Sequence, residues 1–131
     1  MWGRRDLEAG ERFAERRERE DRAPRLSDTV PALDALTLEI RETTSSSGSC
    51  PEAAHLRRVV VERAPALFFI VCHDSYCRDG GHDISREVLA ALRHGQTEFT
   101  GEHRCRGHVG NRDCERTLHF TGAARYRLGS V

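Results

Sequence analysis

The five cysteines of this 131-residue chain are its residues best suited to chemistry. Four of them form two pairs, since Cys72 and Cys77 are separated by four residues, and Cys105 and Cys114 by eight. Thiolates are soft ligands, and a structural zinc ion takes four such ligands in a tetrahedron, commonly as two pairs. The spacing therefore predicts one metal site formed by these four cysteines. Cys50 stands in a Ser-rich stretch beside a proline and is left out of the site.

Two histidines, His82 and His108, stand in the same glycine-containing loops as the cysteine pairs, and either one could replace a thiol. If four protein ligands bind zinc, the site is closed and has a structural role, so we expect a metal-binding interaction domain rather than an enzyme. A [2Fe-2S] cluster on the same cysteines is the alternative cofactor.

Apolar patterns predict the strands that position these cysteines. Apolar and polar residues alternate from Ala35 to Glu42, which predicts a strand with one buried face. A second strand, Leu56 to Arg63, is expected to return against the first. The run from Ala66 to Cys72 is apolar on both faces, so we expect it at the centre of the sheet, with Cys72 at its end.

The spacing of apolar residues then predicts a helix from Ile84 to His94, with Asp83 as its N-cap. A short strand from Thr97 to Gly101 and a terminal hairpin complete the pattern. The hairpin strands are expected at Arg116 to Phe120 and at Ala124 to Leu128, with a three-residue loop that keeps their apolar residues in register. The predicted class is α+β: one main helix on a mixed or antiparallel sheet of five to six strands, in the order strand, strand, strand, helix, strand, strand, strand.

Length and composition are those of one small domain with a polar arm. The chain is 37% apolar and 32% charged, so its apolar fraction is low for a globular domain. Residues 1–26 carry many charges and few apolar side chains, so we expect a flexible or helical arm whose helix stops before Pro24. Residues 35–131 are expected to form a single α+β metal-binding domain, with a flexible loop at 43–55.

The charge distribution argues against a protein whose whole surface binds nucleic acid or membranes, because the formal net charge is zero. Positive charge gathers at the C-terminal end, where the residues that would contact phosphates are Arg104, Arg106, Arg112 and Arg116. Stacking aromatic residues and a recognition helix are not evident there, so we expect a protein partner or a larger assembly instead.

The longest apolar run is too short to cross a bilayer, and the first residues lack the apolar stretch of a secretory signal. We therefore expect no membrane association and a cytoplasmic location. In that reducing compartment, cysteines are better interpreted as metal ligands or reactive thiols than as disulfides.

The order of strands, cysteines and helix from Leu67 to Tyr126 follows a known pattern. Its pieces are Phe69-Ile70-Val71-Cys72, Cys77 followed by glycines and by Leu89-Ala90-Ala91-Leu92, Cys105-Arg106-Gly107, and Cys114 before Leu118-His119-Phe120. This order resembles the thioredoxin-like [2Fe-2S] ferredoxins. The resemblance implies a related topology and a cluster held by the four cysteines, although the first gap is shorter and the last longer than in that family.

A second pattern is local to one loop. Val71-Cys72-His73-Asp74-Ser75-Tyr76-Cys77-Arg78 follows an apolar strand and contains Cys-x5-Arg. The loop resembles the phosphate loop of low-molecular-weight tyrosine phosphatases and related arsenate reductases. The resemblance implies a nucleophilic Cys72 and an Arg78 that clamps the oxyanion, which makes such an enzyme the second alternative.

Overall fold

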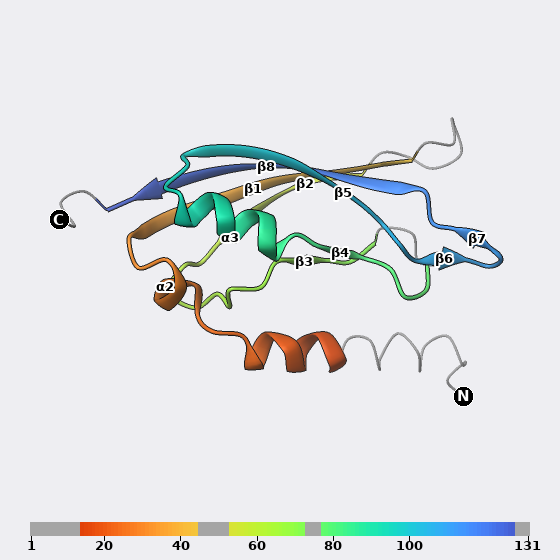
Figure 1. Cartoon of the computed structure of the whole chain (residues 1–131), viewed down its shortest axis with the longest axis horizontal. Helices are drawn as coiled ribbons and strands as arrows, with labels where there is room; N and C mark the ends of the chain where they lie inside the picture. The colour runs from red at the N-terminus through yellow and green to blue at the C-terminus, as the bar shows by residue number, and fades with distance from the viewer. Residues whose placement is uncertain (1–13, 45–52, 73–76, 128–131) are drawn as a thin grey trace.

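The computed structural model describes residues 14–44, 53–72 and 77–127, and their elements form an α+β fold in layers (Figure 1). A four-stranded sheet forms one layer, and α3 with the short strands β3 and β4 lies against its inner face. The elements after the N-terminal helix are α2 (Leu26–Thr29), β1 (Leu33–Thr44), β2 (Ala53–Val59), β3 (Phe69–Ile70), β4 (His82–Asp83), α3 (Ser85–Arg93), β5 (Glu98–Arg104), β6 (His108–Val109), β7 (Arg112–Asp113) and β8 (Arg116–Tyr126). The predicted fold class, a main helix with an antiparallel sheet, is confirmed.

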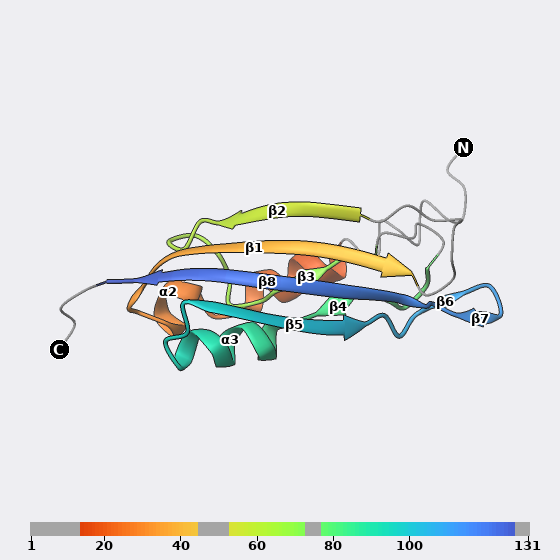
Figure 2. The same cartoon turned by 90° about the horizontal axis from the view of Figure 1, so that it is seen from above.

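The four long strands form one antiparallel sheet in the order β2-β1-β8-β5 (Figure 2). Alternate residues of β1 face the core, since Leu36, Leu38 and Ile40 are 2, 0 and 1% exposed. This burial follows the period-two pattern of the sequence. The first predicted strand and its pairing with a returning second strand are confirmed, although β2 ends at Val59 rather than at Arg63.

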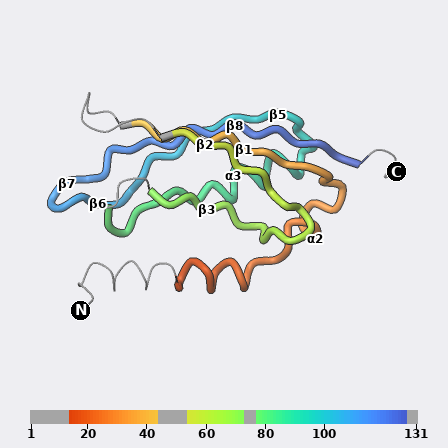
Figure 3. The backbone as a smooth tube through the Cα atoms, turned by 180° about the vertical axis from the view of Figure 1, so that it is seen from behind, coloured from red at the N-terminus to blue at the C-terminus, as the bar shows by residue number. Residues whose placement is uncertain are grey.

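The apolar run from Ala66 to Cys72 is not the centre of the main sheet, so that prediction is wrong. Within it, β3 is a two-residue strand that pairs with β4 in a separate ribbon (Figure 3). The two central places of the sheet belong to β1 and β8, and the run lies in the adjoining layer, where Phe68 and Ile70 are buried. Its continuous apolar character reflects packing between layers rather than a central strand.

The predicted terminal hairpin is also wrong, because residues 116–126 form one long strand, β8. β1 pairs with one edge of this strand and β5 with the other, so the chain has hydrogen-bonding partners on both sides where a turn was expected. Thr121, Gly122 and Ala123 of the expected turn region lie opposite Glu39, Leu38 and Thr37 of β1.

Two glycines in these strands make room for aromatic rings rather than for turns. Phe99 and Gly122 lie directly opposite each other in β5 and β8, and Gly101 and Phe120 repeat the arrangement with the roles reversed. A Cβ atom at Gly122 would meet the Phe99 ring at 2.1–2.6 Å. Glycine inside a strand often marks such a close approach, which explains the turn-like signal in the sequence.

We expect Gly122→Ala to lower the free energy of unfolding by about 1–3 kcal/mol, the usual cost of an extra methyl group in a packed core. Urea denaturation followed by circular dichroism measures this loss. Phe99→Leu removes the clashing ring end, so Gly122→Ala should cost clearly less in the Phe99→Leu background. Equal costs in both backgrounds would contradict the packing explanation.

The main helix agrees with its prediction. α3 begins one residue after the predicted start, and its N-cap is Ile84 rather than the predicted Asp83, whose carboxylate nevertheless accepts a hydrogen bond from the Ser85 N–H at 3.1 Å. Val88 and Leu92 are buried, and Gly95 adopts a φ of 68° just beyond the helix end. In the ranges that the structure describes, no helix has the length and apolar character needed to cross a membrane.

Residues 14–22 form a helix that ends before Pro24, as predicted for the polar arm. This helix contacts the ribbon beneath the sheet, because the Arg19 guanidinium lies 3.3 Å from Asp83 and 5.5 Å from the centre of the Phe69 ring. Leu26, which the sequence assigns to the arm, is fully buried in the core. Of the predicted loop 43–55, residues 45–52 lie outside the described residues, and its two ends extend β1 and β2.

Candidate metal centre

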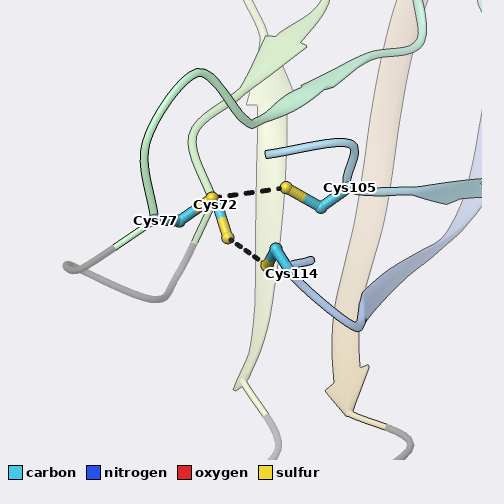
Figure 4. Close-up of side chains that lie close together, drawn as sticks. All are labelled: Cys72, Cys77, Cys105 and Cys114. Carbon is cyan, nitrogen blue, oxygen red and sulfur yellow. Dashed lines mark hydrogen bonds between the residues drawn. The ribbon is translucent and has the colours of Figure 1, made fainter. Parts of the chain in front are cut away.

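The four predicted cysteines lie close together in the fold (Figure 4). Cys72 and Cys77 lie on the segment between β3 and β4, Cys105 follows β5, and Cys114 lies between β7 and β8. They come from both layers, so the group connects the ribbon to the main sheet. Together they form a cluster that can hold a metal ion.

Two of the sulfur–sulfur distances match the edges of a coordination tetrahedron. Cys77 Sγ lies 3.6 Å from Cys105 Sγ, and Cys72 Sγ lies 3.7 Å from Cys114 Sγ. Zn–S bonds of about 2.3 Å in a tetrahedron place the sulfurs ~3.8 Å apart, whereas a disulfide would bring them to ~2.05 Å. All four sulfurs lie within 4.8 Å of one another, which is compact enough for a single ion.

A tight hairpin explains how the eight-residue spacer can hold two ligands of one site. β6 and β7 pair through a two-residue turn, and Gly110 supplies the positive φ, 62°, that this turn requires. At the base of the hairpin, the Cys114 N–H donates to the Gly107 carbonyl at 2.8 Å. The spacer therefore folds on itself and returns Cys114 to the side of Cys105.

Two glycines let the loops close around the sulfurs. A Cβ atom at Gly80 would lie 2.4 Å from Cys77 Sγ and 2.5 Å from Cys105 Sγ, and one at Gly107 would lie 2.6 Å from the Gly80 backbone. The loops are also joined by reciprocal backbone hydrogen bonds of 2.7 and 2.8 Å between Arg78 and His108. Glycine at both positions thus allows the two loops to meet.

The thiols have shifted proton affinities. Burial raises the pKa of Cys77 to about 12, and its interactions with Cys105 and Cys114 act in the same direction. Burial raises the pKa of Cys105 too, but hydrogen bonds from the Gly81 and Gly107 N–H groups and from the neighbouring thiols outweigh it and lower that pKa below its ordinary value. A metal ion that binds all four sulfurs must therefore displace the proton that Cys77 retains at neutral pH.

Neither histidine that the sequence offers as a substitute ligand lies in the four-sulfur cluster. His108 has a 56% exposed side chain, with Nδ1 3.4 Å from an Asp113 carboxylate oxygen. His82 is fully buried, but its Nε2 faces Glu42 at 3.4 Å. The cluster consists of the four cysteines, and the prediction that a histidine replaces one of them is not supported.

A buried polar network lies beside the sulfurs, and its centre is Glu42, which is 3% exposed. One carboxylate oxygen is 3.3 Å from Arg116 Nη1 and accepts a hydrogen bond from the Cys72 thiol at 3.8 Å, and the other oxygen faces His82. His82 Nδ1 in turn lies 3.0 Å from His103 Nδ1. This network extends the site from the sulfurs into the main sheet.

Glu42 is a site residue that the cysteine spacing does not indicate, although the strand pattern carries a signal for it. The alternation that predicts β1 puts Glu42 on the same face as Leu38 and Ile40. Arg116, one of the four arginines that the sequence offers for phosphate contacts, is 5% exposed and faces Glu42, so it does not belong to an exposed basic surface. The other arginines of that surface are exposed: Arg104, Arg106 and Arg112.

The loop behind the phosphatase resemblance is described in part, since residues 73–76 lie outside the described residues, as does Cys50. Arg78 is exposed, and its backbone pairs with His108.

Comparison of the chain with protein-family models, with curated proteins and with solved structures gives no match. The resemblances to ferredoxins and to phosphatases therefore stay predictions.

Proposed function

We propose that Cys72, Cys77, Cys105 and Cys114 bind one zinc ion that holds together a non-enzymatic interaction domain. The observation that carries this proposal is the spacing of the sulfurs, 3.6 and 3.7 Å, which fits the edges of a zinc–thiolate tetrahedron. Four protein ligands leave no open position for a substrate, as in structural zinc sites.

The position of the cluster supports a structural role. The ribbon of β3 and β4 pairs with none of the main-sheet strands, so an ion between the layers would tie the ribbon to β5 and β8. A domain of this size buries a small core, and metal ligation is a common way to stabilise such a domain. The ion would thus supply stability that the apolar residues do not.

The geometry favours a single ion over the alternatives. A [2Fe-2S] cluster places two irons and two sulfides between its cysteine pairs, which needs more room than is left between four cysteine sulfurs that all lie within 4.8 Å of one another.

For a phosphatase, the Glu42 carboxylate, hydrogen-bonded to the Cys72 thiol, would repel both a thiolate and a phosphate. Single-ion thiolate sites bind zinc or iron, so metal analysis decides between these two.

Elemental analysis of the protein purified under reducing, anaerobic conditions should find zinc at one equivalent or more and no stoichiometric iron. The protein should be colourless, and its cobalt-substituted form should show the thiolate charge-transfer bands of a sulfur-rich site. A brown protein with equimolar iron and sulfide would show that the site holds an iron–sulfur cluster instead of zinc. Purification without any bound metal would contradict both the zinc site and the iron–sulfur alternative.

The partner of this domain would bind at the outer edge of β2. β2 is an edge strand, and edge strands present backbone groups that a further strand can pair with. Leu56 and Val60 are 59 and 58% exposed there. Val60 also lines a hollow of about 260 Å³, whose other lining residues include the three arginines Arg57, Arg58 and Arg63 and apolar side chains. An extended segment of another protein with alternating acidic and apolar residues complements this edge.

A peptide of alternating glutamate and valine tests this edge by NMR titration of the labelled protein. We expect amide shifts that concentrate in residues 53–60, and Arg57→Glu/Arg58→Glu should weaken binding at least tenfold, because it reverses the charge at the edge. A lysine–valine peptide is the control and should not bind. Shifts that concentrate on β5, the opposite edge, would disprove this placement.

A further inference from the structure

We propose a second zinc site, formed by Glu42, His82 and Cys72, in which the Cys72 sulfur is shared with the four-cysteine site. This proposal rests on the proposed function, because it uses one of the same ligands. It adds an ion with three protein ligands and a fourth position for water or an exogenous ligand, which the closed four-sulfur site does not have.

The ligand atoms have suitable spacing for a second ion. The Glu42 oxygen, the His82 nitrogen and the Cys72 sulfur lie within 4.8 Å of one another. His82 Nε2 is 3.4 Å from Glu42 Oε2, close to the ~3.35 Å edge that zinc bonds of about 2.0–2.1 Å would produce in a tetrahedron. Cys72 Sγ is 3.8 Å from the other carboxylate oxygen, Oε1, against a ~3.5 Å edge for one sulfur and one oxygen ligand, so the carboxylate would turn slightly to present one oxygen to an ion shared with both His82 and Cys72.

His82 has the orientation of a metal ligand. Its ring is fully buried, its Nε2 faces the carboxylate, and its Nδ1 lies 3.0 Å from His103 Nδ1. Zinc-bound histidines usually hydrogen-bond through the second ring nitrogen, which fixes the tautomer and the ring plane. His103 is placed to be that second partner.

Charge also favours a second cation. Once the four-cysteine site is filled, its four thiolates and the Glu42 carboxylate would carry five negative charges at this end of the core. One zinc ion and the buried Arg116 guanidinium offset three of them, and a second zinc ion offsets the remaining two. Arg78 and Arg106 are exposed, so water screens their contribution.

Metal counting on the 131-residue chain tests the second site. After loading with Zn²⁺ and gel filtration under reducing conditions, we expect two equivalents for the wild type, and one for Glu42→Gln and for His82→Gln. The matched control is the more accessible pair of Glu102 and His119, whose side chains are 71 and 31% exposed and lie 3.2 Å apart. Glu102→Gln and His119→Gln make the same chemical changes there and should keep two equivalents.

A measurement on the wild type alone covers the case in which a buried variant does not fold. With ¹¹³Cd²⁺ in place of zinc, NMR should show two resonances, one of them typical of an all-sulfur site. One equivalent with all-sulfur spectra would overturn the second site and leave the proposed function intact. No bound metal would overturn both, and two equivalents that persist in Glu42→Gln and His82→Gln would place the second ion elsewhere and overturn the proposal.

Discussion

Cys105→Ser is expected to abolish tight zinc binding and to remove about 5 kcal/mol or more of the free energy of unfolding. Structural zinc contributes roughly 10–16 kcal/mol to the folding of small domains, whereas whole domains are stable by about 5–15 kcal/mol. Cys105 is 2% exposed and lies 3.6 Å from Cys77, so a serine there removes a ligand from the middle of the cluster. We therefore expect the variant to lose its cooperative thermal transition.

Thermal unfolding followed by circular dichroism tests this expectation. The wild type treated with a strong chelator should give the same curve as Cys105→Ser, and added zinc should restore the transition in the wild type but not in the variant. Cys50→Ser is the matched control, because Cys50 is not among the predicted ligands, and its melting temperature should be unchanged. A Cys105→Ser protein that melts as the wild type does would show that the cluster does not hold the fold together.

Arg116→Met is expected to cost about 3–5 kcal/mol, the usual cost of removing one partner of a buried ion pair. Methionine keeps much of the volume of the arginine side chain but leaves the Glu42 carboxylate, 3% exposed, without its guanidinium partner and close to the thiolates. Both the desolvated charge and its repulsion from the sulfurs then oppose folding.

The same strand provides the control for this substitution. Arg125 of β8 is paired with Asp34 at 3.1 Å, but the two side chains are 75 and 42% exposed. Exposed pairs contribute about 0–1 kcal/mol, so Arg125→Met should leave the urea midpoint nearly unchanged. Similar losses of unfolding free energy in the two variants would mean that the buried pair has no special role. The metal content of both variants should also be measured, because it distinguishes destabilisation by loss of zinc from destabilisation by loss of the ion pair.

The sequence carried enough information to predict the cysteine cluster and the first strands. Cys72, Cys105 and Cys114 flanked predicted strands and Cys77 lay in the loop after one of them. The alternation around Leu38 required one buried face for β1. Gly110 gave a local turn signal, but only the folded hairpin shows why an eight-residue spacer suits a single site.

The remaining features depend on partners that lie far away in the sequence. Gly122 looked like a turn residue in the sequence. The structure requires glycine there because the Phe99 ring, which belongs to another strand, leaves no room for a side chain. The run that ends at Cys72 looked central because burial between layers and burial in a sheet produce the same apolar pattern. The role of Glu42 required knowledge of Arg116 and His82, which come from two other strands.

The central place of β8 has a consequence for synthesis. β8 pairs with β1, where Leu36 lies opposite Ala124, and it also pairs with β5. Folds with such distant pairings fold in roughly milliseconds to seconds, and a ribosome completes β1 at Thr44 and β5 at Arg104 before β8 begins at Arg116. Until then, two strand edges stay open to pairing with other nascent chains. A chain cut short before Arg116 would keep both edges and lose Tyr126 and the rest of β8, which makes aggregation rather than slow refolding its expected fate.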